Sequence, residues 1–330
     1  MYEKFYDFTG IPFQLTPDSR FFFGSSGHSR AIAHLVYGLA QEEGFIIITG
    51  EVGAGKTTLV EQLWSQLDRE TYVIGRIVTT QVSGDDLLRL VVSSFGYEQQ
   101  GADKATLLRR FEELVRANRD AGKRCLLVVD EVQNLSIGAL EELRMLSNIT
   151  VGGRASVQTI LLGQPQFRRT LSSPDLEQLR QRVLASYHLG PLSEAETRAY
   201  VEHRLKTVGW IDNPRFEDAA FSYIYRASGG IPRRVNTLCS RVLLYGSLEE
   251  TNTITGPMVE ATARELQQDM GTTLAPAPAP TAGGNGYAGS AGADALSSRV
   301  LALEQGAVRQ DRVFRRLLDM LSNYAETQQR

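Results

Sequence analysis

The sequence contains very little cysteine and no long apolar run. Only two cysteines occur among 330 residues, Cys125 inside an apolar stretch and Cys239 within a helical pattern, and no CxxC spacing joins them. Cysteines of this kind indicate buried, reduced thiols rather than a disulfide framework or a metal site. No apolar run approaches the roughly 20 residues that a membrane-spanning helix needs, so we expect no membrane span.

Neither sign of charge dominates the sequence. The net charge is −3, which provides no overall electrostatic reason to expect binding to nucleic acid or anionic lipid, although it is compatible with a local basic patch. The opening stretch MYEKFYDFTGIPF lacks the charged and apolar regions of a secretory signal. We therefore expect a cytoplasmic protein, reaching the inner membrane only through partners.

The stretch GEVGAGKT at residues 50–57 directly follows the apolar run FIIIT and matches the phosphate-loop pattern G-x-x-x-x-G-K-[ST]. Glycines let successive backbone N–H groups turn toward an anion, and the next helix directs its positive end to the same point. Lys56 is expected to reach the terminal phosphates, and the hydroxyl of Thr57, or of Thr58, to hold Mg²⁺. The alternative is a glycine-rich turn that binds nothing. The predicted nucleotide-binding residues in this loop are Gly50, Glu51, Val52, Gly53, Ala54, Gly55, Lys56, Thr57 and Thr58.

Up to about residue 190, short apolar runs alternate with amphipathic stretches. This alternation predicts a parallel β-sheet between layers of helices, and the continuously apolar strands indicate burial on both faces. The expected strands are Phe45–Thr49, Tyr72–Val78, Cys125–Val129, Val157–Leu162 and Ala185–Leu189. The expected helices are Thr57–Leu67, Gly84–Phe95, Lys104–Ala121 and Ile137–Asn148.

Three further regions follow. Residues 191–266 lack strand-like runs and predict a small all-α domain of three or four helices, the first capped by Ser193 and Glu196. Residues 267–294 are rich in Ala, Pro and Gly and predict a flexible linker. Residues 295–330 repeat apolar positions at heptad spacing and predict a coiled-coil helix. The alternative is a single amphipathic helix that docks on the body of the protein or on a partner; we favour self-association.

An acidic pair ends the apolar strand in RCLLVVDEVQNL. In open parallel sheets, the carboxyl ends of the strands lie beside the bound ligand. Asp130 is therefore expected to hold Mg²⁺ together with Thr57, and Glu131 to polarise a water molecule against the terminal phosphate. The alternative is an acidic pair that merely precedes a helix.

Further candidates are polar residues that lie after strands or near helix starts. Gln164 follows the strand VQTILLG and is expected to orient the attacking water or to touch the terminal phosphate, unless it only serves a turn. Arg180 and Arg182 precede the last strand, where an arginine can reach the nucleotide of a neighbouring subunit; the alternative is an ordinary surface arginine. Arg233 or Arg234 begins a helix after a proline and can fold over the phosphates, unless the two form an exposed basic pair.

In their order along the chain, GEVGAGKT, LLVVDE, LLGQP, LRQRV and GIPRRVN resemble the motifs of a bacterial AAA+ ATPase. Among these ATPases, the sequence is similar to the general secretion pathway A-type enzymes and to those of exosortase and exopolysaccharide loci, over residues 1 to about 266. The resemblance implies a three-layer P-loop NTPase domain at residues 1–190 with a helical lid. It also implies Gln164 as sensor 1, Arg182 or Arg180 as arginine finger, and Arg233 as sensor 2.

The same resemblance places Pro12, Phe13 and His28 near the adenine. It implies ATP and Mg²⁺ as cofactors, and a homo-oligomer whose active sites are completed between subunits. It further implies a protein partner within an envelope polysaccharide or secretion complex. The heptad tail is similar to that of the exosortase-associated branch.

We therefore expect an ATPase that cleaves ATP to ADP and phosphate and thereby drives assembly or remodelling of an exosortase-linked envelope system. One alternative is a DNA-associated AAA+ ATPase of the helicase-loader or transposition-regulator type. It is suggested by a basic cluster of Arg226, Arg233, Arg234 and Arg241, but the acidic net charge disfavours it. A second alternative, a nucleotide switch that barely hydrolyses, is disfavoured by Glu131.

Overall fold

The computed structural model of this chain describes residues 2–16, 18–68, 70–78, 84–97 and 103–269. The coiled-coil helix expected at residues 295–330 lies outside the described residues, as does the linker expected at residues 267–294 from residue 270 onward. The division of the whole chain into four regions therefore stays a prediction, although the last described helix, α12 (Gly256–Asp269), extends beyond the boundary expected at residue 266.

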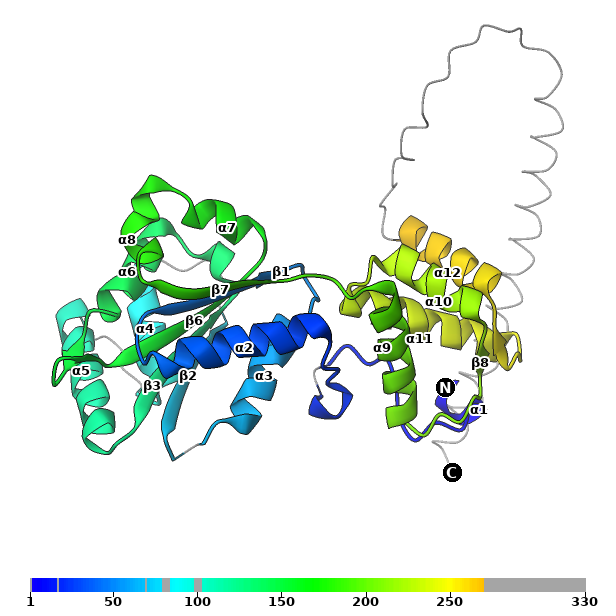
Figure 1. Cartoon of the computed structure of the whole chain (residues 1–330), viewed down its shortest axis with the longest axis horizontal. Coiled ribbons are helices and arrows are strands. Elements are labelled where there is room, and N and C mark those ends of the chain that lie inside the picture. Colours follow the sequence, from blue (N-terminus) through cyan, green and yellow to red (C-terminus); the bar gives the residue numbers. More distant parts are fainter. Residues whose placement is uncertain (1, 17, 69, 79–83, 98–102, 270–330) are drawn as a thin grey trace, which may run out of the picture.

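A five-stranded, fully parallel sheet forms the centre of the larger part (Figure 1). Its order is β2-β3-β6-β1-β7, so the strand that precedes the phosphate loop lies between two neighbours. The strands are β1 (Phe45–Gly50), β2 (Tyr72–Val78), β3 (Arg124–Asp130), β6 (Val157–Gly163) and β7 (Val183–Leu189). The parallel sheet predicted from the sequence is confirmed, and the expected strand limits agree to within about two residues.

Helices cover both faces of the sheet, because successive side chains of a strand point to opposite sides. Phe45 and Ile47 belong to one hydrophobic cluster, and Ile46 and Ile48 belong to another. The first cluster includes residues of α4 (Gly84–Ser94), α5 (Lys104–Asp120), α6 (Ile137–Leu146), α7 (Gln166–Leu171) and α8 (Glu177–Arg180). The second includes residues of α2 (Ser26–Ala40) and α3 (Lys56–Gln66). The three-layer architecture is therefore confirmed.

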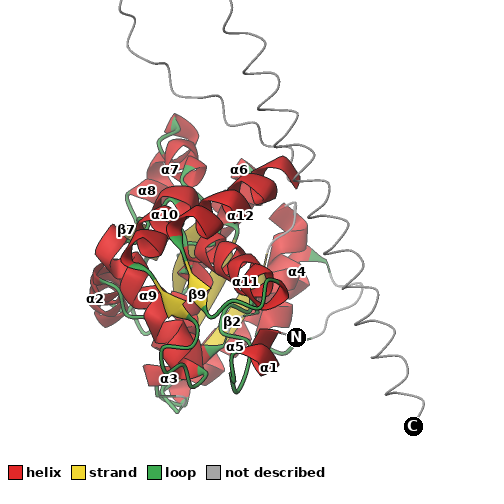
Figure 2. Ribbon diagram, turned by 90° about the vertical axis from the view of Figure 1, so that its right-hand side faces the viewer, coloured by secondary structure: helices red, strands yellow, loops and turns green. Residues whose placement is uncertain are grey.

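A smaller helical unit, the lid, follows the sheet (Figure 2). It consists of α9 (Glu194–Thr207), α10 (Asp218–Ser228), α11 (Pro232–Leu248) and α12, as the helical patterns predicted. The expectation that this region lacks strands was wrong, since β8 (Arg215–Phe216) pairs in parallel with β9 (Thr253–Ile254). Strands of two residues are too short to show the alternation by which strands are found in a sequence. A second short pair, β4 (Thr150–Val151) with β5 (Arg154–Ala155), precedes β6.

The N-terminal segment, which we define as residues 2–16 and 18–23 and which includes α1 (Tyr2–Phe5), packs on the lid (Figure 1). Its buried aromatic residues share one hydrophobic cluster with α9, α10 and α11. These aromatic residues are Tyr2, Tyr6, Phe8, Phe13 and Phe21. The segment was expected to accompany the α/β domain, but its aromatic side chains are buried against the helices of the lid.

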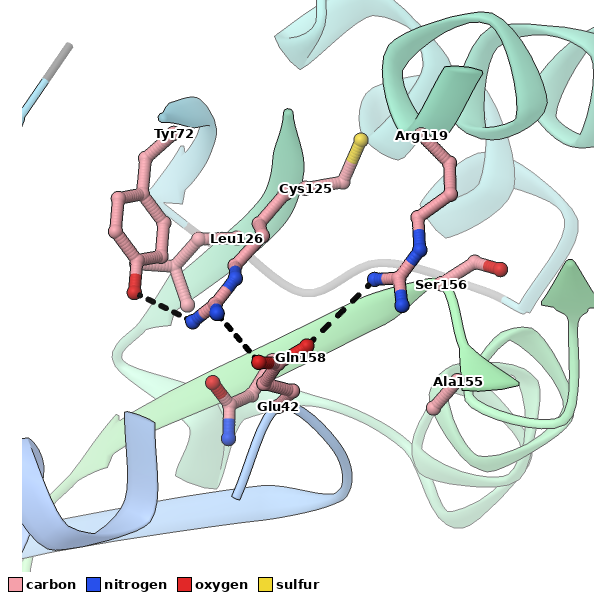
Figure 3. A pocket seen from close by; sticks show the side chains of 9 residues that line it. Glu42, Tyr72, Arg119, Cys125, Leu126, Ala155, Ser156 and Gln158 are labelled. Carbon is pink, nitrogen blue, oxygen red and sulfur yellow. Dashed lines mark hydrogen bonds and ion pairs between the residues drawn. The ribbon is translucent and has the colours of Figure 1, made fainter. Parts of the chain in front are cut away.

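A small pocket lies at the amino ends of the strands, away from the phosphate loop (Figure 3). The carboxylate of Glu42 forms ion pairs with Arg124 and, at 3.7 Å, with Arg119. Arg124 also donates a hydrogen bond of 3.2 Å to the hydroxyl of Tyr72. This cluster joins the end of α2 to the starts of β2 and β3, so we assign it a structural role.

The cap of α9 also joins the lid to the α/β domain. Ser193 and Glu196 form the predicted capping box. One carboxylate oxygen of Glu196 accepts the Ser193 N–H at 3.0 Å, and the other accepts the N–H of Ser26, the first residue of α2, at 2.8 Å. The backbone hydrogen bond from Ser193 is the main cause that lowers the pKa of Glu196 from 4.5 to about 2.

We predict that Glu196→Gln lowers the free energy of unfolding by about 1 kcal/mol at neutral pH, because the neutral amide has one acceptor oxygen for two N–H donors. The pKa of Glu196 is lower in the folded protein than in the unfolded chain, so ionised Glu196 stabilises the fold at pH values above 4.5. This stabilisation is lost as the pH falls from 4.5 toward 2 and the carboxylate becomes protonated. Urea unfolding of both proteins should therefore show a difference that shrinks below about pH 4.5. Glu194→Gln, in the same helical turn, is the control. A difference independent of pH would contradict the prediction.

Candidate nucleotide-binding site

The phosphate loop lies between the buried strand β1 and helix α3, as predicted. Gly53 and Gly55 have φ angles of 82° and 96°, a region that L-residues with side chains rarely adopt. Helix α3 begins at Lys56, so its unpaired N–H groups lie at the end of the loop. The geometry is that of an anion-binding helix start.

Lys56, Thr57 and Asp130 meet beside this loop. The ammonium group of Lys56 is buried and donates to the carbonyl oxygens of Gly50 at 2.8 Å and Glu51 at 3.1 Å. Burial lowers the pKa of Lys56, against the opposing influence of Glu131, Asp130 and Glu51. The hydroxyl of Thr57 donates to a carboxylate oxygen of Asp130 at 2.8 Å. A hydroxyl and a carboxylate held together beside a phosphate site match the oxygen ligands that Mg²⁺ takes.

Glu131 and Gln164 also lie together, because β3 and β6 are neighbours and end at the same edge of the sheet. The side-chain amide of Gln164 donates to Glu131 at 3.1 Å. Gln133, which the sequence interpretation did not single out, donates to the same carboxylate oxygen and accepts the backbone N–H of Gln164 at 2.9 Å. The only feature of the sequence that points to Gln133 is its position, two residues after Glu131.

Arg233, at the start of α11, contacts the phosphate loop from the lid. Its backbone N–H donates to the carbonyl oxygen of Gly53 at 3.2 Å. A Cβ atom on Gly53 would lie 2.3 Å from the Cβ of Arg233, so this contact requires glycine. The start of α11 is therefore seated directly on the loop.

A cavity of about 370 Å³ lies between the phosphate loop, the lid and the N-terminal segment. Of the three residues expected near the adenine, His28 lines this cavity, and burial lowers its pKa. Phe13 instead belongs to the hydrophobic cluster of the lid, and the carbonyl oxygen of Pro12 accepts a hydrogen bond from the lid. The N-terminal residues that line the cavity include Gln14, Leu15 and Thr16, directly after that pair.

Arg180 and Arg182 lie outside this cavity, at the end of α8 and just before β7. The guanidinium of Arg182 donates to the hydroxyl of Ser147, at the end of α6, at 2.9 Å. Arg180 is exposed, and its side chain forms no hydrogen bond or ion pair with the described residues. Of the two, Arg180 has the side chain that is available to a second subunit.

The described residues contain no cluster of three or more His, Cys, Asp or Glu side chains that could hold a metal ion. Cys125 and Cys239 are free and buried, as predicted. Along the same described ranges, we find no helix of the length and apolarity that crossing a membrane demands.

The fold and the site together define a P-loop nucleoside triphosphatase of the AAA+ class. Consistent with this, residues 39–171 match the family described as the AAA domain. The chain has the AAA+ fold and is similar to general secretion pathway protein A of Aeromonas hydrophila, with 38% identity over 278 residues. That alignment includes 82% of this chain and 50% of the relative, so the chain spans about half the relative's length.

Solved structures share the fold at much lower identity. The ORC2 protein of Aeropyrum pernix, in ADPNP–ADP complexes, superimposes with a TM-score of 0.56 and 18% identity, over 72% of this chain and 66% of that chain. Cdc6p of Pyrobaculum aerophilum superimposes with a TM-score of 0.60 and 15% identity, over 76% of this chain and 71% of that chain. Identities this low establish the common fold alone.

We predict that Gly53→Ala weakens nucleotide binding at least tenfold, about 1.4 kcal/mol or more, because the new Cβ separates Arg233 from the loop. Gly122→Ala is the matched control, since Gly122 also has a positive φ of 74° but has no atom near its added Cβ. Both variants carry the backbone cost of a positive φ, and only the first disturbs the site. Titration with a fluorescent nucleotide measures the effect; equal losses in the two variants would contradict it.

Proposed function

We propose that this protein is an ATPase that uses Mg²⁺-dependent hydrolysis of ATP to drive assembly or remodelling of an envelope secretion or polysaccharide system. The observation that supports the chemistry best is the convergence of Thr57 with Asp130, and of Glu131 with Gln164, at one edge of the sheet beside the phosphate loop. Phosphoryl transfer needs mainly positioning and neutralisation of charge. These groups supply the positioning, while Lys56 and a Mg²⁺ ion held by Thr57 and Asp130 would supply the positive charge.

Each residue then has a separate task. The loop amides and Lys56 bind the phosphates, while Thr57 and Asp130 would hold Mg²⁺, which neutralises phosphate charge when bound. Glu131 orients the attacking water and accepts its proton. Gln164 and Gln133 donate to the carboxylate of Glu131 and keep it at the mouth of the site. Arg233 acts from the lid on the phosphates.

We predict that Glu131→Gln reduces ATP turnover by about two to four orders of magnitude, because an amide cannot accept the proton of the attacking water. The shape of the side chain is kept, so the affinity for ATP should stay within about twofold, less than 0.5 kcal/mol. Phosphate release and calorimetric titration measure the two quantities. Glu113→Gln, on the exposed face of α5, is the control. Undiminished hydrolysis would reject Glu131 as the catalytic base.

The site is proposed to be completed by an arginine from a neighbouring subunit. The exposed Arg180 fits this role better than Arg182, whose side chain is bound to Ser147. Hydrolysis per subunit should then rise with protein concentration, because each site depends on association with a second subunit.

We predict that Arg180→Ala lowers turnover by about a thousandfold, with ATP affinity retained. Mixing it with Lys56→Ala subunits should restore part of the activity, because those subunits keep Arg180 while the others keep a working phosphate loop. Arg182→Ala is the comparison variant, and a loss of its thermal stability is expected from the broken bond to Ser147. Absence of recovery in the mixture, or full activity of Arg180→Ala alone, would contradict a role in trans.

The envelope system is proposed from similarity alone. The relative named general secretion pathway protein A supports a link to secretion, and the predicted tail supports the exosortase-linked branch. Identification of proteins that co-purify with the full chain in the presence of ATP tests this proposal; recovery of DNA-processing proteins would oppose it.

A DNA-associated role receives less support from the basic cluster than the sequence suggested. Arg233 is seated on the phosphate loop, Arg226 stacks on the ring of Tyr223, and Arg241 pairs with Asp269 at 3.2 Å. The side chains of Arg226 and Arg241 thus already have partners within the lid, which leaves less of the cluster free to contact a nucleic acid backbone. Salt-dependent binding to duplex DNA would nevertheless revive this alternative.

A further inference from the structure

Arg204, on α9, is a buried arginine in the wall of the nucleotide cavity. Its guanidinium donates to the carbonyl oxygens of Pro12 at 2.6 Å and Gln14 at 3.3 Å, and to the hydroxyl of Tyr200 at 2.8 Å. It also lies 4.5 Å from the centre of the Phe21 ring. Among the described residues, no carboxylate forms an ion pair with it.

Burial of a charge without an opposite charge is costly unless hydrogen bonds and polarisable groups replace the lost water. Here two carbonyl oxygens, a hydroxyl and an aromatic face perform that task. The carbonyl groups belong to the N-terminal segment, directly before Leu15 and Thr16, which line the cavity. Arg204 therefore fixes the position of one cavity wall relative to the lid.

The hydrogen bonds of Arg204 continue to Asn236 on α11. The hydroxyl of Tyr200 and the Oδ1 atom of Asn236 lie 2.9 Å apart. Because arginine can only donate, Tyr200 accepts from Arg204 and turns its own proton to Asn236. The side-chain oxygen of Asn236 therefore accepts this hydrogen bond, which fixes the orientation of the Asn236 amide group.

The remaining polar group of Asn236 is the Nδ2 amide, a donor. No described residue accepts a hydrogen bond from it, although Asn236 is only 7% exposed and lines the cavity. Asn236 lies about one helical turn after Arg233, which contacts the phosphate loop, and it is linked through Tyr200 to Arg204 beside the N-terminal segment. A nucleotide whose phosphates bind the loop would place its base and sugar in the remainder of this cavity, and the lining of the cavity includes Asn236.

We propose that the Nδ2 amide of Asn236 donates a hydrogen bond to an acceptor atom of the nucleoside, and that Arg204, through Tyr200 and the N-terminal segment, positions this contact. The assignment rests on the proposed function, since it names further binding and positioning residues of the same site. Asn236 is a nucleoside-binding residue, and Arg204 is a positioning residue that keeps the two cavity walls together.

The test compares ATP with inorganic triphosphate, which has the phosphates but no nucleoside. Calorimetric titrations of the full chain with Mg²⁺ are made on the wild type, Asn236→Leu and Arg204→Lys. Asn236→Leu should raise the Kd for ATP about tenfold and leave the Kd for triphosphate within about twofold. Arg204→Lys keeps the charge but loses the fork of donors, so it should also weaken ATP alone, with turnover at saturating ATP within about twofold.

Thr237→Val, at the next position of α11 and outside the cavity lining, is the control and should change neither affinity. Equal weakening of both ligands, or no change for ATP, would overturn the proposal. Should Asn236→Leu fail to fold, Tyr200→Phe decides the same question, because it removes the hydroxyl that orients the amide. A wild-type protein that binds neither ligand would instead reject the proposed function itself.

Discussion

Burial of β1 on both faces is the constraint on which the site depends. Ile46, Ile47 and Ile48 are at most 1% exposed, and each such side chain contributes about 1.5–3 kcal/mol through removal from water. The strand pairs with β6 on one side and β7 on the other, so its carboxyl end cannot shift alone. The phosphate loop therefore begins from a fixed point, and its glycines adopt the backbone angles that the curved loop requires.

The opposite wall of the cavity depends on a second hydrophobic core. The aromatic residues of the N-terminal segment are buried with the lid helices rather than with the sheet. Since this segment and α11 both line the cavity, a movement of the lid would carry both with it. Among the described residues, polar links between the two units include the contacts of Arg233 with Gly53 and of Glu196 with Ser26. Nucleotide binding and lid position are thus coupled through few contacts.

Local patterns in the sequence predicted much of this arrangement. The apolar strands, the phosphate loop and the capping box of Ser193 and Glu196 each depend on neighbouring residues, and all appear in the structure. Gln133, Arg204 and Asn236 were not predicted, because their roles arise from hydrogen bonds between segments far apart in the sequence. The placement of the N-terminal segment escaped prediction for the same reason: apolar spacing shows that a face is buried but not what covers it.

The two arginines before β7 show what a structure adds to such a pattern. In the sequence, Arg180 and Arg182 are equivalent candidates, two positions apart. In the fold, the Arg182 side chain binds within its own subunit, because its guanidinium donates a hydrogen bond to the Ser147 hydroxyl at the end of α6. Its transfer to a neighbouring nucleotide would leave that partly buried hydroxyl without this partner and would cost about 1 kcal/mol or more. Arg180 makes no such bond with the described residues, so its extension toward a second subunit carries no comparable loss.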